Sequence, residues 1–209
     1  MGGIKVIAVD LGGVLFSEGK KVAFSNLAKK YNYDEKIILP LISARLSQIA
    51  NDTRKGLVDE EVFWEWVQNN LPVGYDAKLI RQEWWDGYVL DPEIFSVFKK
   101  VKSLGSVKLI IFSGNFSSRV AYLEEKYHFE SIFDEKIYSF NEHLNKTGNC
   151  KQFLEVLIKK SGVKAGEILY LDDGEDFIEE ANKLGMRGKV CNAGEMKRLA
   201  NYLEEFGIN

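Results

Sequence analysis

Acidic and hydroxyl side chains follow three apolar stretches of this sequence, each at the point where the stretch ends. Asp10 follows IKVIAV, and Ser113 follows KLIIF. The third stretch, ILYL, is followed by the neighbouring acids Asp172 and Asp173. Carboxylates gathered at one site repel each other unless they share a divalent cation, and hard oxygen ligands favour Mg²⁺, which also bridges to phosphate. A hydroxyl group suits a phosphate oxygen. These residue types therefore predict a magnesium site that binds a phosphate group.

The elements that must position these groups are strands of a parallel sheet. Each of the three stretches is short and apolar, as is typical of a strand buried on both faces. Because the carboxyl ends of parallel strands share one edge of a sheet, the polar groups converge there. Two weaker strands are predicted at 136–139 and 189–191, and helical patterns lie between the strands. The expected fold is α/β, with a Rossmann-like parallel sheet of five strands and helices on both faces.

Residues 17–91 contain no convincing strand and predict an inserted helical bundle. Helical periodicity covers four segments, at about 22–33, 34–46, 58–71 and 76–85. The polar stretch 51–56 is expected to be a loop. Within the bundle, Phe63, Trp66 and Trp84 are expected to pack inside. One Trp of each close pair is expected to pack and the other to face solvent or the cleft, because neighbouring positions on a helix point apart.

The bulk composition restricts the partners. The 209 residues carry a formal net charge of -3, and no basic face indicates nucleic acid. No apolar run reaches the length that spans a membrane, and no secretion signal precedes the first strand. Cys150 and Cys191 lack metal-site spacing and are expected to be free thiols in a reducing compartment. We therefore expect a cytoplasmic protein, a monomer or homodimer, with no nucleic-acid or membrane partner.

These residues resemble the motifs of the haloacid-dehalogenase-like superfamily, whose members are mostly Mg²⁺-dependent phosphatases. The family's first motif is Asp-x-Asp-x-Val or Thr after an apolar strand, and DLGGV, starting at Asp10, is similar to it. The second motif ends a strand on Ser or Thr, as in IIFSGN. The fourth places Ala-x-x-x-Gly-Met after two acids, as in LYLDDGEDFIEEANKLGM. The resemblance implies a core domain of residues 1–16 and 92–209, with a helical cap at 17–91.

The resemblance also implies a role for each matching position. Asp10 is the expected nucleophile, which attacks phosphorus to form an aspartyl-phosphate that water then hydrolyses. The expected Mg²⁺ ligands are Asp10, Asp173, the backbone carbonyl of Gly12 and, directly or through water, Asp172. The expected substrate-binding residues are Ser113, Gly114, Asn115 and Gly13.

The catalytic lysine of the family has two candidates in this sequence. Aligned on Gly162 and the double acid, its expected position is Gly148, with Lys146 two residues before it and Lys151 three residues after it. We predict Lys146, because Lys-Thr-Gly-Asn can form the family's loop with a two-residue extension. Lys151 is the alternative.

Gly12 departs from the family pattern, because the phosphatases carry there a second Asp that protonates the leaving group and later activates water. Glycine does neither, and positioned acid–base catalysis is worth ~10²–10⁴-fold. Some phosphatase relatives that resemble the N-terminal domain of epoxide hydrolases do carry Asp-Leu-Gly. The chain therefore resembles the helical-cap group of epoxide-hydrolase N-terminal phosphatases and sugar 1-phosphatases. A second departure is Phe177, where the family has an Asn behind the metal-binding acids. From the resemblance we expect a phosphatase that acts on a small phosphorylated metabolite. The alternatives are an impaired phosphate-binding or regulatory protein and, less favoured, a 2-haloacid dehalogenase.

Overall fold

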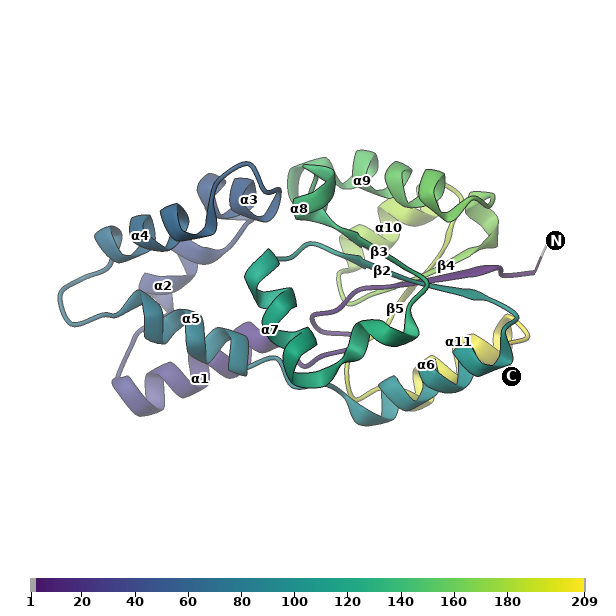
Figure 1. Ribbon diagram of the computed structural model, residues 1–209, viewed down its shortest axis with the longest axis horizontal. Helices are drawn as coiled ribbons and strands as arrows, with labels where there is room; N and C mark the ends of the chain where they lie inside the picture. Colours follow the sequence, from purple (N-terminus) through teal and green to yellow (C-terminus); the bar gives the residue numbers. More distant parts are fainter. Residues whose placement is uncertain (1–2, 209) are drawn as a thin grey trace.

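The computed structural model describes residues 3–208 and contains a five-stranded parallel sheet (Figure 1). The strands are β1 (Val6–Val9), β2 (Lys108–Ser113), β3 (Glu135–Tyr138), β4 (Ile168–Asp172) and β5 (Arg187–Val190). Their spatial order is β3-β2-β1-β4-β5, and every neighbouring pair is parallel. The three central strands are almost entirely buried, which explains their continuous apolar runs. The outer strands β3 and β5 are less buried, so their sequence signal is weaker. The predicted α/β fold is confirmed.

Helices cover both faces of the sheet (Figure 1). Val6 and Ala8 of β1 share an apolar cluster with α9 (Lys146–Ser161) and α10 (Glu175–Lys183). The alternate residues Ile7 and Val9 pack on the opposite side. That side is covered by α6 (Pro92–Leu104), α7 (Ser117–Tyr127) and α11 (Met196–Glu205). The short elements are α8 (Ser139–Glu142) and the 3₁₀ turns η1 (Phe129–Ile132) and η2 (Ala165–Glu167).

Five helices follow β1 and lie together at the end of the sheet where the central strands finish (Figure 1). These helices, which we call the helical lobe, are α1 (Gly19–Tyr31), α2 (Glu35–Ile42), α3 (Gln48–Arg54), α4 (Glu60–Asn70) and α5 (Ala77–Asp86). The prediction of a loop at 51–56 is wrong over most of its length, because α3 extends to Arg54. Ser47 caps this helix, and its Oγ accepts a hydrogen bond from Ala50 N–H at 3.4 Å.

The tryptophans of the lobe are more buried than the sequence predicts. Trp84 and Trp85 are both buried, because Phe116 at the start of α7 packs against both rings, with centroid distances of 5.6 and 5.9 Å. In the other pair, Trp64 is the buried ring and Trp66 is partly exposed. Only the pair Trp64 and Trp66 therefore has one buried and one partly exposed ring. The exposed ring is Trp66, which was expected to pack inside.

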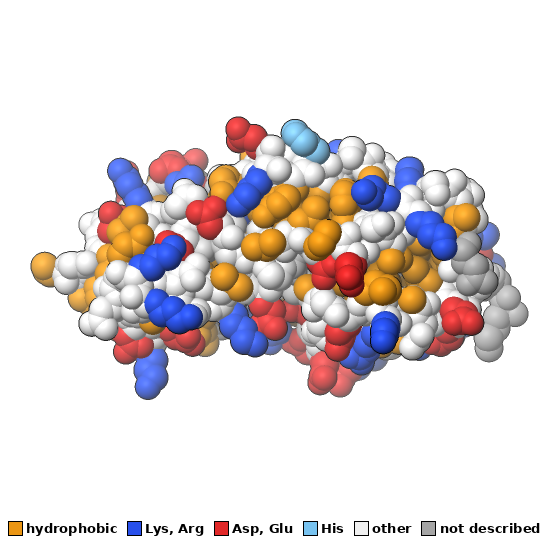
Figure 2. Space-filling model, turned by 90° about the horizontal axis from the view of Figure 1, so that it is seen from below, with side chains coloured by type: hydrophobic (Ala, Val, Ile, Leu, Met, Phe, Trp, Pro, Cys, Tyr) orange, Lys and Arg blue, Asp and Glu red, His pale blue; other side chains and the backbone are white. Residues whose placement is uncertain are grey.

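The surface carries mixed charge. On the face in Figure 2, Lys and Arg side chains are interspersed with Asp and Glu, and patches of hydrophobic side chains lie between them. This distribution agrees with a net charge of only -3. No helix within residues 3–208 combines the length and the apolar character needed to cross a membrane.

Candidate active site

The predicted polar groups meet at the carboxyl edge of the sheet. Asp10 directly follows β1, whereas Ser113 and Asp172 are the last residues of β2 and β4. Strand β1 lies between β2 and β4, and the Asp10 N–H donates to the carbonyl of Leu171 at 2.9 Å. The parallel register thus gathers residues from three distant parts of the chain around the end of the central strand.

Three carboxylates are crowded together in this site. One oxygen each of Asp10, Asp172 and Asp173 lies within 4.8 Å of the other two. Burial raises the pKa of Asp10, and the Lys146 ammonium only partly opposes this rise. Partial burial, followed by the charges of Asp10 and Asp172, raises the pKa of Asp173 to about 7. Hard oxygen donors that repel one another in this way fit a divalent cation such as Mg²⁺.

Asp172 is the most enclosed of the three acids and is fully buried. Its Oδ2 accepts hydrogen bonds from Lys146 Nζ and from the Tyr170 hydroxyl. Its Oδ1 accepts from the Gly174 N–H at 2.8 Å. Because both oxygens already have donors, Asp172 is better placed to orient Lys146, and to reach a metal through water, than to bind a metal directly.

Lys146 is buried between two of these carboxylates. Its Nζ lies 3.0 Å from Asp10 Oδ1 and also contacts Asp172, with 6% of the side chain exposed. Burial disfavours the ammonium form, but the two carboxylates outweigh it and raise the pKa of Lys146. The backbone leaves helical geometry just after this residue, where Gly148 has a φ of +83°, so Lys146 precedes the regular part of α9. The alternative, Lys151, is exposed on α9.

The loop after β1 has no room for larger side chains. Gly13 has a φ of +81°, and a Cβ there would lie 2.2 Å from Asp173 Oδ2. A Cβ on Gly12 would lie 2.9 Å from Cε1 of Tyr88, so the tyrosine ring fills the space into which a side chain at position 12 would project. The Gly13 N–H donates to the carbonyl of Phe16 at 2.8 Å. Gly13 therefore allows close approach to the site but does not offer a free donor to substrate.

Asn115 organises the end of β2. Its Nδ2 donates to Ser113 Oγ at 3.4 Å, and its Oδ1 accepts from Arg119 Nε at 2.5 Å. A Cβ on Gly114 would lie 2.3 Å from Asn145 Oδ1, so the glycine lets this backbone approach the segment that carries Lys146. Asn115 thus acts as a positioning residue rather than as an open donor.

Comparison with known proteins identifies the family of this chain. A family model of haloacid dehalogenase-like hydrolases matches residues 4–185. The chain belongs to this family. It is 38% identical to an uncharacterised protein of Dictyostelium discoideum over 177 residues, which make up 83% of this chain and 74% of that protein.

Solved structures share the fold of this haloacid dehalogenase-like hydrolase. A family enzyme of Bacteroides thetaiotaomicron, in complex with magnesium and inorganic phosphate, superposes with a TM-score of 0.74 at 19% identity, over 92% of this chain and 96% of that one. The L-2-haloacid dehalogenase of Xanthobacter autotrophicus gives a TM-score of 0.62 at 17% identity, over 88% of this chain and 76% of that one. The protein is therefore a hydrolase, and its reaction depends on the chemistry of its own site.

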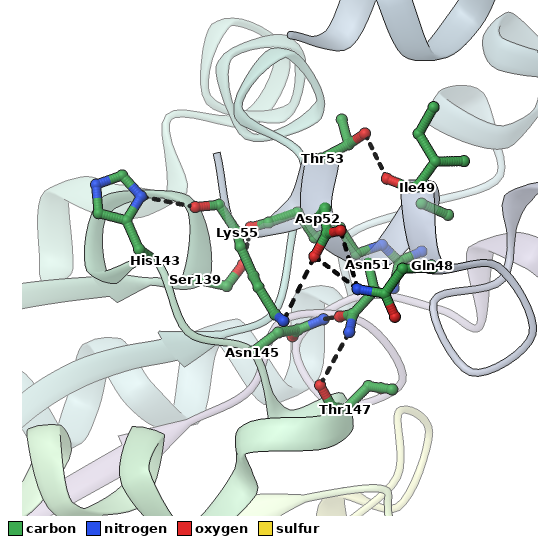
Figure 3. Close-up of polar contacts among 12 residues, drawn as sticks. Gln48, Ile49, Asn51, Asp52, Thr53, Lys55, Ser139, His143, Asn145 and Thr147 are labelled. Carbon is green, nitrogen blue, oxygen red and sulfur yellow. Dashed lines mark hydrogen bonds and ion pairs between the residues drawn. The ribbon is translucent and has the colours of Figure 1, made fainter. Parts of the chain in front are cut away.

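Asn51 of α3 clamps the lysine segment of the hydrolase. Its Oδ1 accepts from Asn145 Nδ2 at 2.8 Å, and its Nδ2 donates to the Thr147 carbonyl at 3.3 Å (Figure 3). These bonds hold the residues on both sides of Lys146. Sequence reasoning missed Asn51 because it placed this segment in a loop. The available signal was Ser47, a residue type that caps helices.

A cavity of about 530 Å³ opens over these residues and is lined by both the helical lobe and the sheet loops. Its lining includes Lys20, Arg54, Tyr88 and Arg119, which were not singled out from the sequence. Isolated charges in helical segments look like solvated residues. Only the place of Arg119, in the first turns of the helix that follows Ser113, pointed to this edge of the sheet.

Proposed function

We propose that this hydrolase is a Mg²⁺-dependent phosphatase that cleaves a small phosphomonoester through an aspartyl-phosphate at Asp10. The observation that carries the proposal is the pairing of Asp10 with Lys146 beside the acids Asp172 and Asp173. A carboxylate nucleophile repels a phosphate dianion, and an ammonium group together with a divalent cation removes that repulsion. The Bacteroides enzyme was crystallised with both magnesium and phosphate, which supports the same pair of ligands here.

The residues of the site have separate tasks in this reaction. The Asp10 carboxylate attacks phosphorus, and the ester oxygen leaves with the electron pair of its bond to phosphorus. Lys146 and the Ser113 hydroxyl stabilise the charge on the phosphoryl oxygens. Water then attacks phosphorus and releases inorganic phosphate from Asp10. When bound, Mg²⁺ would be held by Asp10, Asp173 and the Gly12 carbonyl, and it would neutralise phosphate charge.

The division of the chain belongs to the same proposal. Residues 17–91 act as a cap over a core of residues 1–16 and 92–209. Both parts line the cavity of about 530 Å³, a size that suits a small metabolite. Closing such a cavity excludes water and strengthens the electrostatic interactions inside it.

Two other functions are less well supported. Asp10 could displace halide from a 2-haloacid, but that anionic substrate has no need of a divalent cation, and three clustered carboxylates would oppose its approach. A phosphate-binding protein without turnover is favoured by one observation, the absence of an acid at Gly12.

Phosphate release tests the proposal. Wild-type protein and Asp10→Asn are assayed with 4-nitrophenyl phosphate and with alkyl phosphates, in Mg²⁺ and in EDTA. We expect Mg²⁺-dependent turnover that falls on the order of 10⁴–10⁶-fold in Asp10→Asn, because the nucleophile is lost. Mass spectrometry of acid-quenched wild-type enzyme should find phosphate on the peptide that contains Asp10.

Asp76→Asn is the matched control, because Asp76 caps α5 outside the cavity and Asn is an equally good cap. Its activity should equal that of the wild type. Equal trace rates in wild type and Asp10→Asn, with phosphate binding retained, would contradict the phosphatase and favour a phosphate-binding protein without turnover. Chloride release from 2-chloropropionate would instead favour the dehalogenase.

A further inference from the structure

Two guanidinium groups in the active-site cavity have no carboxylate partner among residues 3–208. Arg54 comes from α3 in the helical lobe and Arg119 from α7 beside the sheet, and both line the cavity that contains Asp10. Arg119 is only 3% exposed. Arg54 Nε and Arg119 Nη1 are buried without a hydrogen-bond acceptor among residues 3–208, and neither guanidinium forms an ion pair with that part of the chain. Buried charges are normally paired, because desolvation is costly.

Aromatic rings hold the two side chains in place. Arg119 Cζ lies 4.5 Å from the ring centroid of Tyr88 and 5.1 Å from that of Trp84. Arg54 Cζ lies 4.9 Å from the ring centroid of Phe116 and 5.6 Å from that of Trp84. Ring faces attract the positive charge, but they do not accept the in-plane hydrogen bonds of a guanidinium group. The cage therefore orients the arginines and leaves donors free for a ligand.

Positive charge accumulates in this part of the cavity. Burial and then the charge of Arg119 lower the pKa of Arg54 to about 10. Burial, followed by the charges of the two arginines, lowers the pKa of Lys20 to about 8. Glu60 attracts Arg119 from a distance, but its carboxylate accepts a hydrogen bond from the Ser118 N–H at 3.0 Å and forms no ion pair with Arg119. A bound anion would stabilise all three cations.

We propose that Arg54 and Arg119 form a second anion site, which binds a carboxylate or a second phosphate elsewhere on the substrate. The proposal rests on the phosphatase function and specifies its substrate class, a phosphomonoester that carries another anionic group. The planar donors of arginine match both kinds of oxyanion in pairs. Asn115 connects this site to the phosphoryl site, because it bonds to Arg119 on one side and to Ser113 on the other.

Matched substrates test this second site. 3-Phosphoglycerate and glycerol 3-phosphate differ by one carboxylate, and the bisphosphate and monophosphate of 1,3-propanediol differ by one phosphate. We expect wild-type kcat/KM to favour the member with the extra anionic group in at least one pair, and the favoured pair identifies the anion. Arg54→Gln and Arg119→Gln should each reduce kcat/KM for that member about 10- to 100-fold more than for the partner that lacks the extra anionic group.

Arg81→Gln is the matched control, because Arg81 stacks 5.6 Å from the Trp85 centroid but pairs with Glu61 and does not line the cavity. Its substrate preference should equal that of the wild type. The absence of a preference in the wild type would overturn the proposal, as would equal losses for both members of a pair. Calorimetry of the same compounds with Asp10→Asn tests the second site even where no turnover occurs, so its failure is distinguishable from failure of the phosphatase function.

An independent observation concerns the acidic side chain that is missing at position 12. The Tyr88 hydroxyl lies 3.5 Å from the position that a Cβ on Gly12 would occupy. This tyrosine lines the cavity and is 7% exposed. Its hydroxyl makes no hydrogen bond with the residues that the structure describes. A phenol is therefore present where an acidic side chain at position 12 would reach.

We infer that Tyr88 protonates the leaving group of the proposed phosphatase reaction. As the phosphorus–oxygen bond breaks, the ester oxygen takes the Tyr88 hydroxyl proton and departs as an alcohol. The tyrosinate then accepts a proton from the water that attacks the aspartyl-phosphate, which restores Tyr88 and releases phosphate. Tyrosine is an established general acid and base in enzymes.

The dependence on leaving group tests Tyr88. Tyr88→Phe should reduce kcat for glycerol 3-phosphate on the order of 10²–10⁴-fold and affect 4-nitrophenyl phosphate much less, because nitrophenolate leaves without a proton. Equal losses for both substrates, or no loss for either, would contradict the inference. Gly12→Asp alone should clash with the ring, whereas Gly12→Asp with Tyr88→Ala should recover alkyl-phosphate turnover relative to Tyr88→Ala. Asp10-dependent cleavage of 4-nitrophenyl phosphate in the wild type tests the phosphatase function separately.

Discussion

The single ammonium group of Lys146 is the counter-ion of two carboxylates, those of Asp10 and Asp172. We expect Lys146→Met to lower the free energy of unfolding by about 3–5 kcal/mol in EDTA, because Asp10 and Asp172 lose their shared counter-ion. The loss should be smaller in Mg²⁺, since the metal supplies positive charge to the same oxygens. Vanadate inhibition should also weaken strongly, because Lys146 stabilises phosphoryl charge in the proposed reaction. Denaturant unfolding and inhibition assays measure the two effects.

Lys151→Met is the control for this prediction, because Lys151 is an exposed residue of the same helix. Its stability and vanadate inhibition should stay close to those of the wild type. A larger effect at Lys151 than at Lys146 would transfer the proposed role to Lys151.

The residues that end buried strands could be placed from the sequence, whereas those that face them across the cavity could not. Asp10, Ser113 and Asp172 follow apolar runs whose parallel pairing fixes one common edge. Arg54 and Arg119 carry no such pattern, because a charged residue on a short helix has the same local signature whether it faces solvent or a cavity. Their partners are aromatic rings from other elements, and no sequence spacing predicts those contacts.

At the scale of elements, α3 shows why a polar segment is read as a loop. Its helix-forming interactions are polar: Gln48 Nε2 donates to both carboxylate oxygens of Asp52 at 2.9 Å, one turn further on. Asn51 bonds instead to Asn145 and Thr147 at the start of α9, as Figure 3 shows. A helix that packs through hydrogen bonds has no apolar stripe. Its 3.6-residue periodicity therefore cannot be detected from the pattern of hydrophobic residues. The strands and the longer helices bury apolar faces, and they were predicted.

At the scale of the whole molecule, one apolar cluster continues from the sheet into the helical lobe. Phe116 is fully buried and lies at the junction, with its ring centroid 5.5 Å from that of Phe63 and 5.6 Å from that of Trp84. From continuous burial of this kind we expect the two parts to unfold together. The protein has four tryptophans, at positions 64, 66, 84 and 85, and all of them lie in α4 and α5. Tryptophan fluorescence therefore reports the lobe, and far-ultraviolet circular dichroism reports the whole chain.

These two probes test the coupling between the lobe and the sheet. Wild-type protein should give coincident unfolding curves by fluorescence and dichroism. Phe116→Ala should lower the free energy of unfolding by about 3–5 kcal/mol, and its fluorescence transition should occur at lower denaturant concentration than its dichroism transition, because the junction is lost. Phe98→Ala is the control, since Phe98 is equally buried in α6 and packs against Phe133, away from the lobe. It should destabilise the protein while its two curves stay coincident. Coincident curves in Phe116→Ala would mean that other contacts, such as those of Asn51 and Glu60, are sufficient to couple the lobe to the sheet.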